Sequence, residues 1–146
     1  MIYYLIASIL IAVTALFART KRAVLAAGIL FYAVQIAAAG LLLWGGLYDT
    51  TSAAFFTFDA LGTLFYLLLV VVSMYVFGHS EAYLQGEDLR SYRLYFALLM
   101  LLTTAIAGAY FANNLAVTWI FLEATTLCSA GIIYHRRTAQ ALEAAW

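Results

Sequence analysis

An acidic side chain within a long apolar segment is the residue of this sequence best placed to do chemistry. Glu123 is the only charged residue between positions 113 and 134, a stretch about as long as a helix that crosses a bilayer. A carboxylate at the centre of such a helix costs roughly 2.5–3.5 kcal/mol on insertion scales, so it usually faces a bundle interior or a hydrated cavity. Acids in this position often lie on a proton or ion path, and we predict this role for Glu123. The alternative is a permanently protonated glutamic acid that is hydrogen-bonded to a neighbouring helix.

Two neighbours could support this carboxyl group. Trp119 precedes Glu123 by four residues and Thr126 follows it by three, so a helix would bring the three side chains to one face. We predict Trp119 and Thr126 as supporting residues, with the Thr126 hydroxyl either holding a water molecule or sharing a proton with Glu123. The alternative for Thr126 is a hydrogen bond to its own helix backbone, which is common for threonine in membrane helices.

Other polar residues in apolar surroundings have simpler interpretations. Gln35 lies deep in a second apolar segment, and we predict that it holds helices together by hydrogen bonding. Asp59 stands at the start of a third segment, where a negative charge near a helix N-terminus is favourable by roughly 0.3–1 kcal/mol. His79 and His135 are expected in solvated loops at the ends of segments.

The patterns of soluble-enzyme chemistry are missing from these 146 residues. There is no glycine-rich phosphate loop, no paired Cys or His ligand set, and no nucleophile with a base at a readable spacing. Cys128 is the single cysteine, and we interpret it as a small apolar filler. The formal net charge is zero, which argues against a nucleic-acid partner. We therefore expect no catalytic residue, no cofactor and no metal, in a chain that moves or holds something.

The elements that must position these residues follow from hydropathy. Apolar residues make up 67% of the chain and charged residues 10%, whereas a soluble domain has about 25% charged residues. Only helices satisfy the backbone within such apolar segments in lipid. The sequence predicts an all-α, polytopic transmembrane helical bundle that forms a single transmembrane domain over residues 1–146. Five spans and the start of a sixth, at residues 138–146, are expected. The five predicted spans are residues 2–18, 23–47, 58–78, 94–112 and 115–134.

The basic residues give an independent test of this topology. All seven Lys and Arg side chains fall at positions 19–22, 90–93 and 136–137, which five spans would place on one side of the membrane. The positive-inside rule then puts these loops in the cytoplasm and the N-terminus outside, in the periplasm of a cell inner membrane. Because no basic residue precedes the first apolar segment, we interpret it as a retained helix and not as a signal peptide.

Small residues on the fourth predicted span indicate close helix packing. Thr104, Gly108 and Ala112 recur at every fourth position, so they would line one face of a helix. Rows of this kind allow another helix to approach closely in a membrane.

Three stretches of the sequence resemble one family of membrane proteins. FFTFDALGTLF at 55–65, NNLAVTWIFLEATTLCSAGIIYH at 113–135 and ALEAAW at 141–146 are similar to the antiporter-like membrane subunits of respiratory complex I and its group 4 hydrogenase relatives. The strongest likeness is to the large proton-conducting subunit of formate hydrogenlyase and hydrogenase-4 complexes. It covers roughly residues 55–146 and depends mainly on the segment around Glu123. The resemblance implies that this glutamate tunes a lysine on a later helix and so helps to drive proton transfer.

The chain also departs from that family. Its members have many more helices, and no lysine follows Lys21 in this sequence. The resemblance therefore implies the N-terminal portion of a larger antiporter-like fold, in a non-catalytic subunit of a redox-driven oxidoreductase complex. Its expected partners are other membrane subunits and the lipid bilayer. Two alternatives stay open, a small multidrug-type proton-coupled exporter and a structural membrane subunit without transport.

Overall fold

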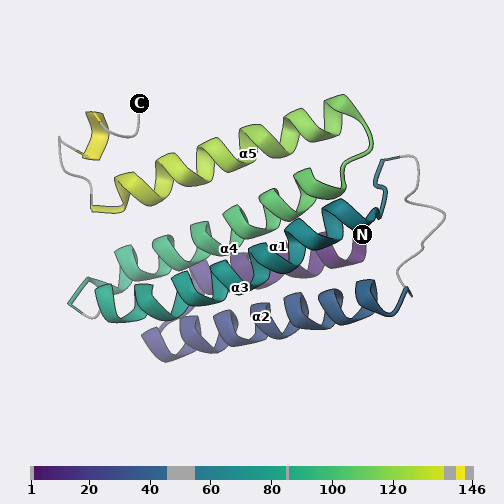
Figure 1. The fold of residues 1–146 in the computed structure, drawn as a ribbon. Coiled ribbons are helices and arrows are strands. Elements are labelled where there is room, and N and C mark those ends of the chain that lie inside the picture. The colour runs from purple at the N-terminus through teal and green to yellow at the C-terminus, as the bar shows by residue number, and fades with distance from the viewer. Residues whose placement is uncertain (1, 46–54, 85, 137–140, 144–146) are drawn as a thin grey trace.

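The computed structural model is a bundle of antiparallel helices, and it describes residues 2–45, 55–84, 86–136 and 141–143 (Figure 1). Each helix is followed by one that runs in the opposite direction, as short connections between apolar segments require. The elements in chain order are α1 (Ile2–Phe17), α2 (Lys21–Leu43), α3 (Ala60–Tyr83), α4 (Leu89–Phe111), α5 (Leu115–Ile133) and the short 3₁₀-helix η1 (Tyr134–Arg136).

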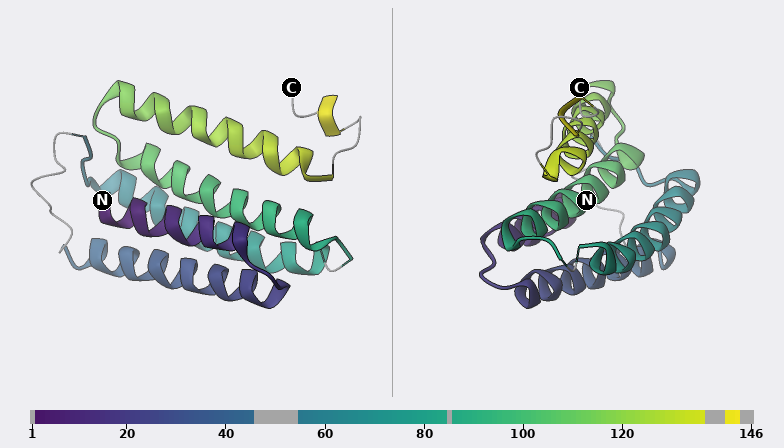
Figure 2. Two further views of the ribbon diagram at one scale, coloured as in Figure 1. Left: turned by 180° about the vertical axis from the view of Figure 1, so that it is seen from behind. Right: turned by 90° about the vertical axis from the view of Figure 1, so that its left-hand side faces the viewer.

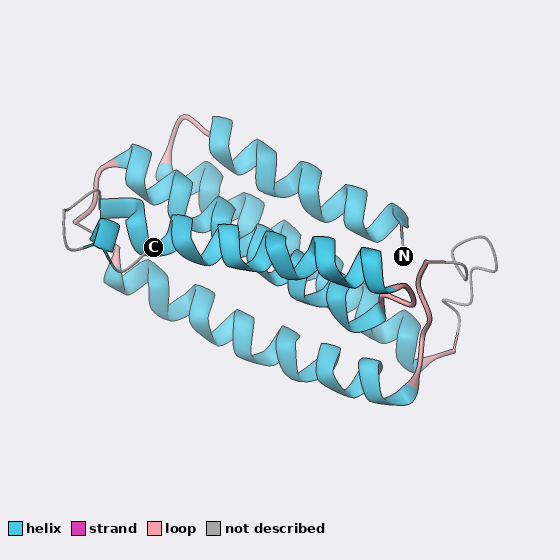
Figure 3. Cartoon of the chain, turned by 90° about the horizontal axis from the view of Figure 1, so that it is seen from above, coloured by secondary structure: helices cyan, strands magenta, loops and turns pink. Residues whose placement is uncertain are grey.

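The prediction of an all-helical membrane-type protein is confirmed at this level. Helices, turns and one isolated β-bridge account for the secondary structure of the described residues, as the uniform colouring of Figure 3 shows. Four helices, α2 to α5, are long and apolar enough to cross a membrane. The apolar helix α1 has 16 residues and so rises about 24 Å at 1.5 Å per residue, less than the roughly 30 Å of hydrocarbon.

Two helices extend beyond the predicted spans, and for the same reason. The third helix continues to Tyr83 where an end at 78 was expected, and the fourth begins at Leu89 where 94 was expected. Hydropathy marks where lipid gives way to water, but a helix can continue past that boundary with polar residues. His79 is accordingly an exposed helical residue and not a loop residue.

Two further predictions fall partly on residues that the structure leaves out. The second helix ends at Leu43, and the rest of the predicted span lies partly outside the described residues, since positions 46 and 47 are among those left out. Most of the expected sixth span also lies outside the described part of the chain, apart from one helical turn at 141–143.

Helix α4 is the centre of the bundle. It packs against α1, α2, α3 and α5, while α5 among the helices contacts α4 alone. Figure 2 shows α5 beside α4 at the edge of the molecule, away from α2 and α3. Small side chains of α4 allow these approaches, and Ala97, Ala105, Ala107 and Gly108 are all buried. By contrast, no described residue of α5 is fully buried.

Two clusters of apolar side chains fill the bundle. One lies toward the end of the bundle where α2 begins, with Phe31, Phe96 and Met100 at its centre. The other lies toward the opposite end and includes Tyr66 and Phe111. Aromatic rings dominate both clusters because they fill wide spaces between helices with rigid apolar surface.

The predicted basic segments meet at one end of the bundle. The Lys21 ammonium donates to the Glu87 carbonyl at 2.7 Å and lies over the Tyr92 ring, 5.2 Å from its centroid. The Arg93 guanidinium donates to the Ala18 carbonyl at 3.1 Å. Helix η1, which contains Arg136, packs against α4 near this end, while Arg137 lies outside the described residues. The described parts of the three basic segments therefore lie toward one end of the bundle.

The opposite end is tied by the backbone and by a helix cap. The amide of Thr57 donates to the Phe111 carbonyl at 2.8 Å, so the segment before α3 pairs with the turn between α4 and α5. Asp59 caps α3, since its side chain accepts a hydrogen bond from the Gly62 amide at 3.1 Å. The interpretation of Asp59 as a helix-start residue is confirmed.

Candidate functional site

The predicted site residue Glu123 lies near the middle of α5, a helix of 19 residues. Its side chain is exposed, and its carboxyl oxygens form no ion pair or hydrogen bond with the described part of the chain. The bundle therefore presents this carboxyl group outward, on the face of α5 that points away from α4. No described helix covers that face.

The residues beside Glu123 make this face mainly apolar. Trp119 and Ile120 lie one turn before it, and Leu127 lies one turn after it, with exposed fractions of 62%, 61% and 71%. Trp119 is thus on the face of Glu123, as the spacing predicts. A band this apolar around a single carboxyl group belongs in contact with lipid or with another protein and not with water.

Thr126 forms a hydrogen bond to its own helix backbone, which was the alternative to a role beside the carboxyl group. Its hydroxyl donates to the Glu123 backbone carbonyl at 2.8 Å. Thr125 does the same one residue earlier, donating to the Leu122 carbonyl at 2.7 Å. Since the hydroxyl proton of Thr126 is committed to its own helix, the Thr126 oxygen can act toward the carboxyl group as an acceptor only.

Contacts with α4 fix how α5 is rotated. The Phe121 ring lies on Gly108, so closely that a Cβ atom added to this glycine would be 2.4 Å from the ring. Near the other end, Leu98 of α4 packs against Gly131 of α5. Gly108 belongs to the row of small residues on α4 that predicted the close approach of another helix. The part of α5 that comes closest to this glycine is the Phe121 side chain. These contacts turn Glu123 away from the bundle.

A second group of polar residues lies inside the bundle. Gln35 is fully buried on α2, and its Oε1 atom accepts hydrogen bonds from the Tyr4 hydroxyl at 2.5 Å and the Tyr66 hydroxyl at 2.7 Å. The predicted role of Gln35 in joining helices is confirmed, because these bonds connect α1, α2 and α3. The two tyrosine partners were not predicted.

Helix α3 carries this polar character along its buried face. Tyr66, Ser73 and Ser80 recur every seven residues and are all buried. The Ser73 carbonyl accepts a hydrogen bond from the Tyr32 hydroxyl at 2.9 Å, and the Ser80 and Tyr95 hydroxyls are 3.0 Å apart. The seven-residue spacing was available in the sequence as a signal for these residues.

The prediction for His135 was wrong. It was expected in a solvated loop, but it lies in η1 and is only 8% exposed. Its ring packs edge-on against Tyr95 with centroids 5.3 Å apart, and its Nδ1 atom is 2.7 Å from the Ile132 carbonyl oxygen. The short helix η1 folds the chain back on α4 after α5 ends, which covers this ring.

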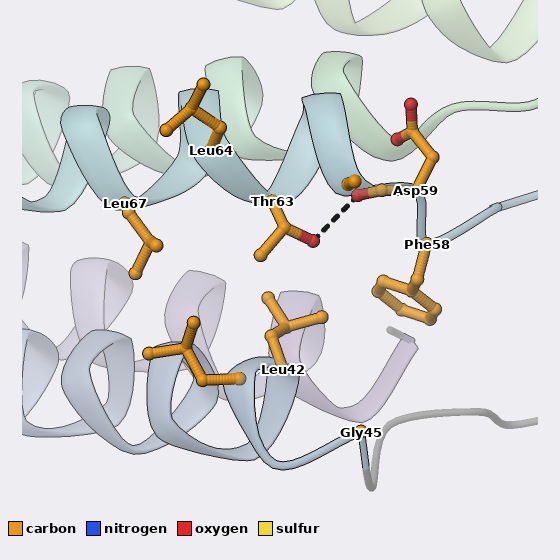
Figure 4. A pocket seen from close by; sticks show the side chains of 9 residues that line it. Leu42, Gly45, Phe58, Asp59, Thr63, Leu64 and Leu67 are labelled. Carbon is orange, nitrogen blue, oxygen red and sulfur yellow. Dashed lines mark hydrogen bonds between the residues drawn. The ribbon is translucent and has the colours of Figure 1, made fainter.

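A hollow of about 410 Å³ opens between the end of α2 and the start of α3 (Figure 4). Its lining includes the leucine side chains of Leu42, Leu64 and Leu67, and Asp59 is also among the lining residues. The Thr63 hydroxyl donates to the Asp59 carbonyl there at 2.8 Å, so this polar contact serves the helix start. We assign no chemistry to this hollow.

No described group of three His, Cys, Asp or Glu side chains could hold a metal ion. Comparison of the chain with protein-family models, with curated proteins and with solved structures finds no match.

Proposed function

We propose that this chain is the N-terminal portion of an ion-translocating subunit in the membrane arm of a complex I-like or group 4 hydrogenase-like assembly. Glu123 is its charge-coupling group. Redox chemistry belongs to partner subunits, and the chain itself takes no cofactor. The resemblance of residues 55–65 and 113–135 to antiporter-like subunits supports this proposal.

The observation that carries the proposal is the outward-facing carboxyl group of Glu123 at the middle of α5. Facing lipid, a charged acid at that depth would cost several kcal/mol, by the scales used for membrane insertion. Among the described α-helices, α5 contacts α4 alone, so its other face is available to a further protein helix. A membrane helix of another subunit, or of a longer form of this chain, would cover the face.

The chemistry of the covering helix follows from charge complementarity. A buried ammonium group next to an ionised carboxylate has a raised pKa, and moving the two groups apart lowers that pKa again. A lysine opposite Glu123 would therefore take up a proton in one arrangement and release it in the other. Glu123 acts in this scheme as the group that tunes a proton carrier.

The membrane arrangement that goes with this function has five spans, with α1 as a short first span. The end of the bundle at Lys21 and Arg93 faces the cytoplasm, in keeping with the positive-inside rule. The start of α1 then faces the periplasm. Lipid surrounds the remaining apolar surface, and nucleic acid is not a partner.

The test is a Glu123→Gln substitution in the complete assembly, purified from native membranes and reconstituted in vesicles. We expect electron transfer to continue while the rate of ion uptake falls by about tenfold or more, a barrier change of at least about 1.4 kcal/mol. Glu81→Gln is the matched control, because Glu81 is an exposed acid on α3 near the basic end of the bundle. This control should leave uptake unchanged.

Two other outcomes would contradict the proposal. Normal ion uptake by an assembled Glu123→Gln variant would indicate a structural membrane subunit. Release of protons by the purified chain on adding a cationic drug, without any redox partner, would indicate a small exporter. Identification of the subunits that copurify with the chain separates both outcomes from a simple failure to assemble.

A further inference from the structure

The polar cluster around Gln35 has hydrogen-bonding capacity that the helices do not use. Both tyrosine hydroxyls, from Tyr4 and Tyr66, donate to the same Oε1 atom of Gln35, and Tyr66 also lies 3.1 Å from the Gln35 carbonyl oxygen. The Nε2 atom of Gln35 is buried and has no hydrogen-bond partner among the described residues. The Oε1 atom of this amide thus accepts two hydrogen bonds, while its Nε2 atom makes none.

This imbalance does not depend on the orientation of the amide. If the amide were turned by half a rotation, the two tyrosine hydroxyls would accept from Nε2 and the Oε1 atom would be the unpaired one. In either case, one polar end of a fully buried Gln35 side chain lacks a protein partner.

A second unpaired group belongs to the same cluster. Ser8 of α1 is fully buried, and its hydroxyl has no hydrogen-bond partner within the part of the chain that the structure describes. The side chains of Ser8, Gln35 and Tyr66 surround the Tyr4 hydroxyl. Two unpaired polar atoms in one apolar bundle are unfavourable, since a buried polar group without a partner has lost its hydrogen bonds to water.

We propose that this cluster is a binding site for an ordered water molecule, held by the Gln35 amide and the Ser8 hydroxyl between α1, α2 and α3. A water molecule can donate two hydrogen bonds and accept two, so it satisfies an amide donor and a serine hydroxyl together.

The chemistry of the cluster favours water over a metal ion. All of its oxygens are uncharged, whereas hard cations are held mainly by carboxylates and by six to eight oxygen ligands. The short contacts at Oε1 are hydrogen bonds from hydroxyl groups, which fill the positions that a cation would need. The site is independent of Glu123 and of the function proposed for it.

The first test is the sign of a stability change. We expect Ser8→Ala to lower the unfolding temperature of the full chain in detergent, because it removes one ligand of the bound water. A dry, unpaired Ser8 hydroxyl would give the opposite sign, since its removal relieves an unsatisfied polar group. A raised or unchanged unfolding temperature would therefore overturn the proposal.

The second test observes the water directly. The infrared spectrum of the protein in ordinary water, minus that in ¹⁸O-labelled water, should contain a band from a bound water molecule. Ser8→Ala and Gln35→Met should both abolish that band. Ser73→Ala is the matched control, because the Ser73 hydroxyl is buried on α3 but already donates to the Val70 carbonyl at 3.1 Å. This control should retain the band.

The two tests together give a decision even if one variant fails to fold. If Gln35→Met is unstable, the loss of the band in Ser8→Ala with its retention in Ser73→Ala supports the site. A wild-type spectrum without an ¹⁸O-sensitive bound-water band, or a band that persists in Ser8→Ala, contradicts it.

Discussion

The Tyr66 hydroxyl is one of the few polar groups that bind helices together inside this bundle. It donates to Gln35 across the contact of α3 with α2, in surroundings where the ring is almost fully buried. We predict that Tyr66→Phe lowers the free energy of unfolding by about 1 kcal/mol, since it leaves Gln35 with one fewer partner and keeps the ring. The measurement is reversible unfolding in mixed micelles.

Tyr75 provides the control for this substitution. It lies on the same helix and is 73% exposed, so Tyr75→Phe removes the same atom from a surface position. We expect it to change the free energy of unfolding by less than about 0.5 kcal/mol. Equal losses in the two variants would mean that the interior hydrogen bond contributes nothing specific.

Residue types predicted some of these polar contacts but not their partners. A lone glutamine in an apolar segment indicates a bond between helices, and Gln35 makes two. Tyrosines in the same segments are ambiguous, because they suit both membrane interfaces and helix interiors. His135 was assigned wrongly because the short turn η1, which covers it, has no hydropathy signal.

At the scale of the helix, one glycine sets how closely α5 approaches α4. The Phe121 ring occupies the space where a side chain at position 108 would go. We predict that Gly108→Val lowers the free energy of unfolding by about 1–3 kcal/mol through overpacking. Adding Phe121→Ala to the same chain should recover part of that loss, because the ring that collides is gone.

The glycine at position 78 serves as the comparison. A Cβ atom added to Gly78 would meet no other atom within 4 Å, although the residue is also helical. Gly78→Ala should therefore be neutral or stabilising, by up to about 1 kcal/mol. For the Gly108→Val, Phe121→Ala double variant, a loss of unfolding free energy equal to the sum of the losses in the two single variants would show that Gly108 and Phe121 do not interact.

The helices themselves were the most predictable elements, and their ends the least. An uninterrupted apolar run indicates a helix because lipid leaves no other way to satisfy the backbone, and α5 begins at the predicted residue 115. The start of α4 was missed because Arg90 and Arg93 are polar yet continue the helix in the interfacial region. Hydropathy alone therefore does not locate helix termini.

At the scale of the whole molecule, α5 is attached to the bundle by one face only. Its helix contacts are with α4 and η1, its Phe121 ring also meets Phe56 before α3, and exposed apolar side chains such as Trp119, Ile120 and Leu127 surround Glu123. From the sequence we expected protein around this acid in a membrane, and the described helices do not provide that protein. A property of an assembly cannot be read from the arrangement of one chain.

The last prediction compares the effect of one substitution on the stability of the isolated chain with its effect on the binding of partner subunits. Because the Glu123 carboxyl group forms no hydrogen bond or ion pair with the described helices, Glu123→Leu should keep the free energy of unfolding of the isolated chain within about 0.5 kcal/mol. In native membranes, the same variant should recover markedly less of the partner subunits when the chain is affinity-purified. The reason is that a basic group opposite Glu123 would be left buried without its counter-charge, at a cost of about 3–5 kcal/mol.

Glu81→Leu, which changes an exposed acid near the basic end of α3, should affect neither quantity. Full recovery of the partners with Glu123→Leu would mean that lipid, and not a charged helix, covers this face of α5. A large loss of stability in the isolated chain would instead place the carboxyl group in a contact within the bundle, which its exposed position on α5 argues against.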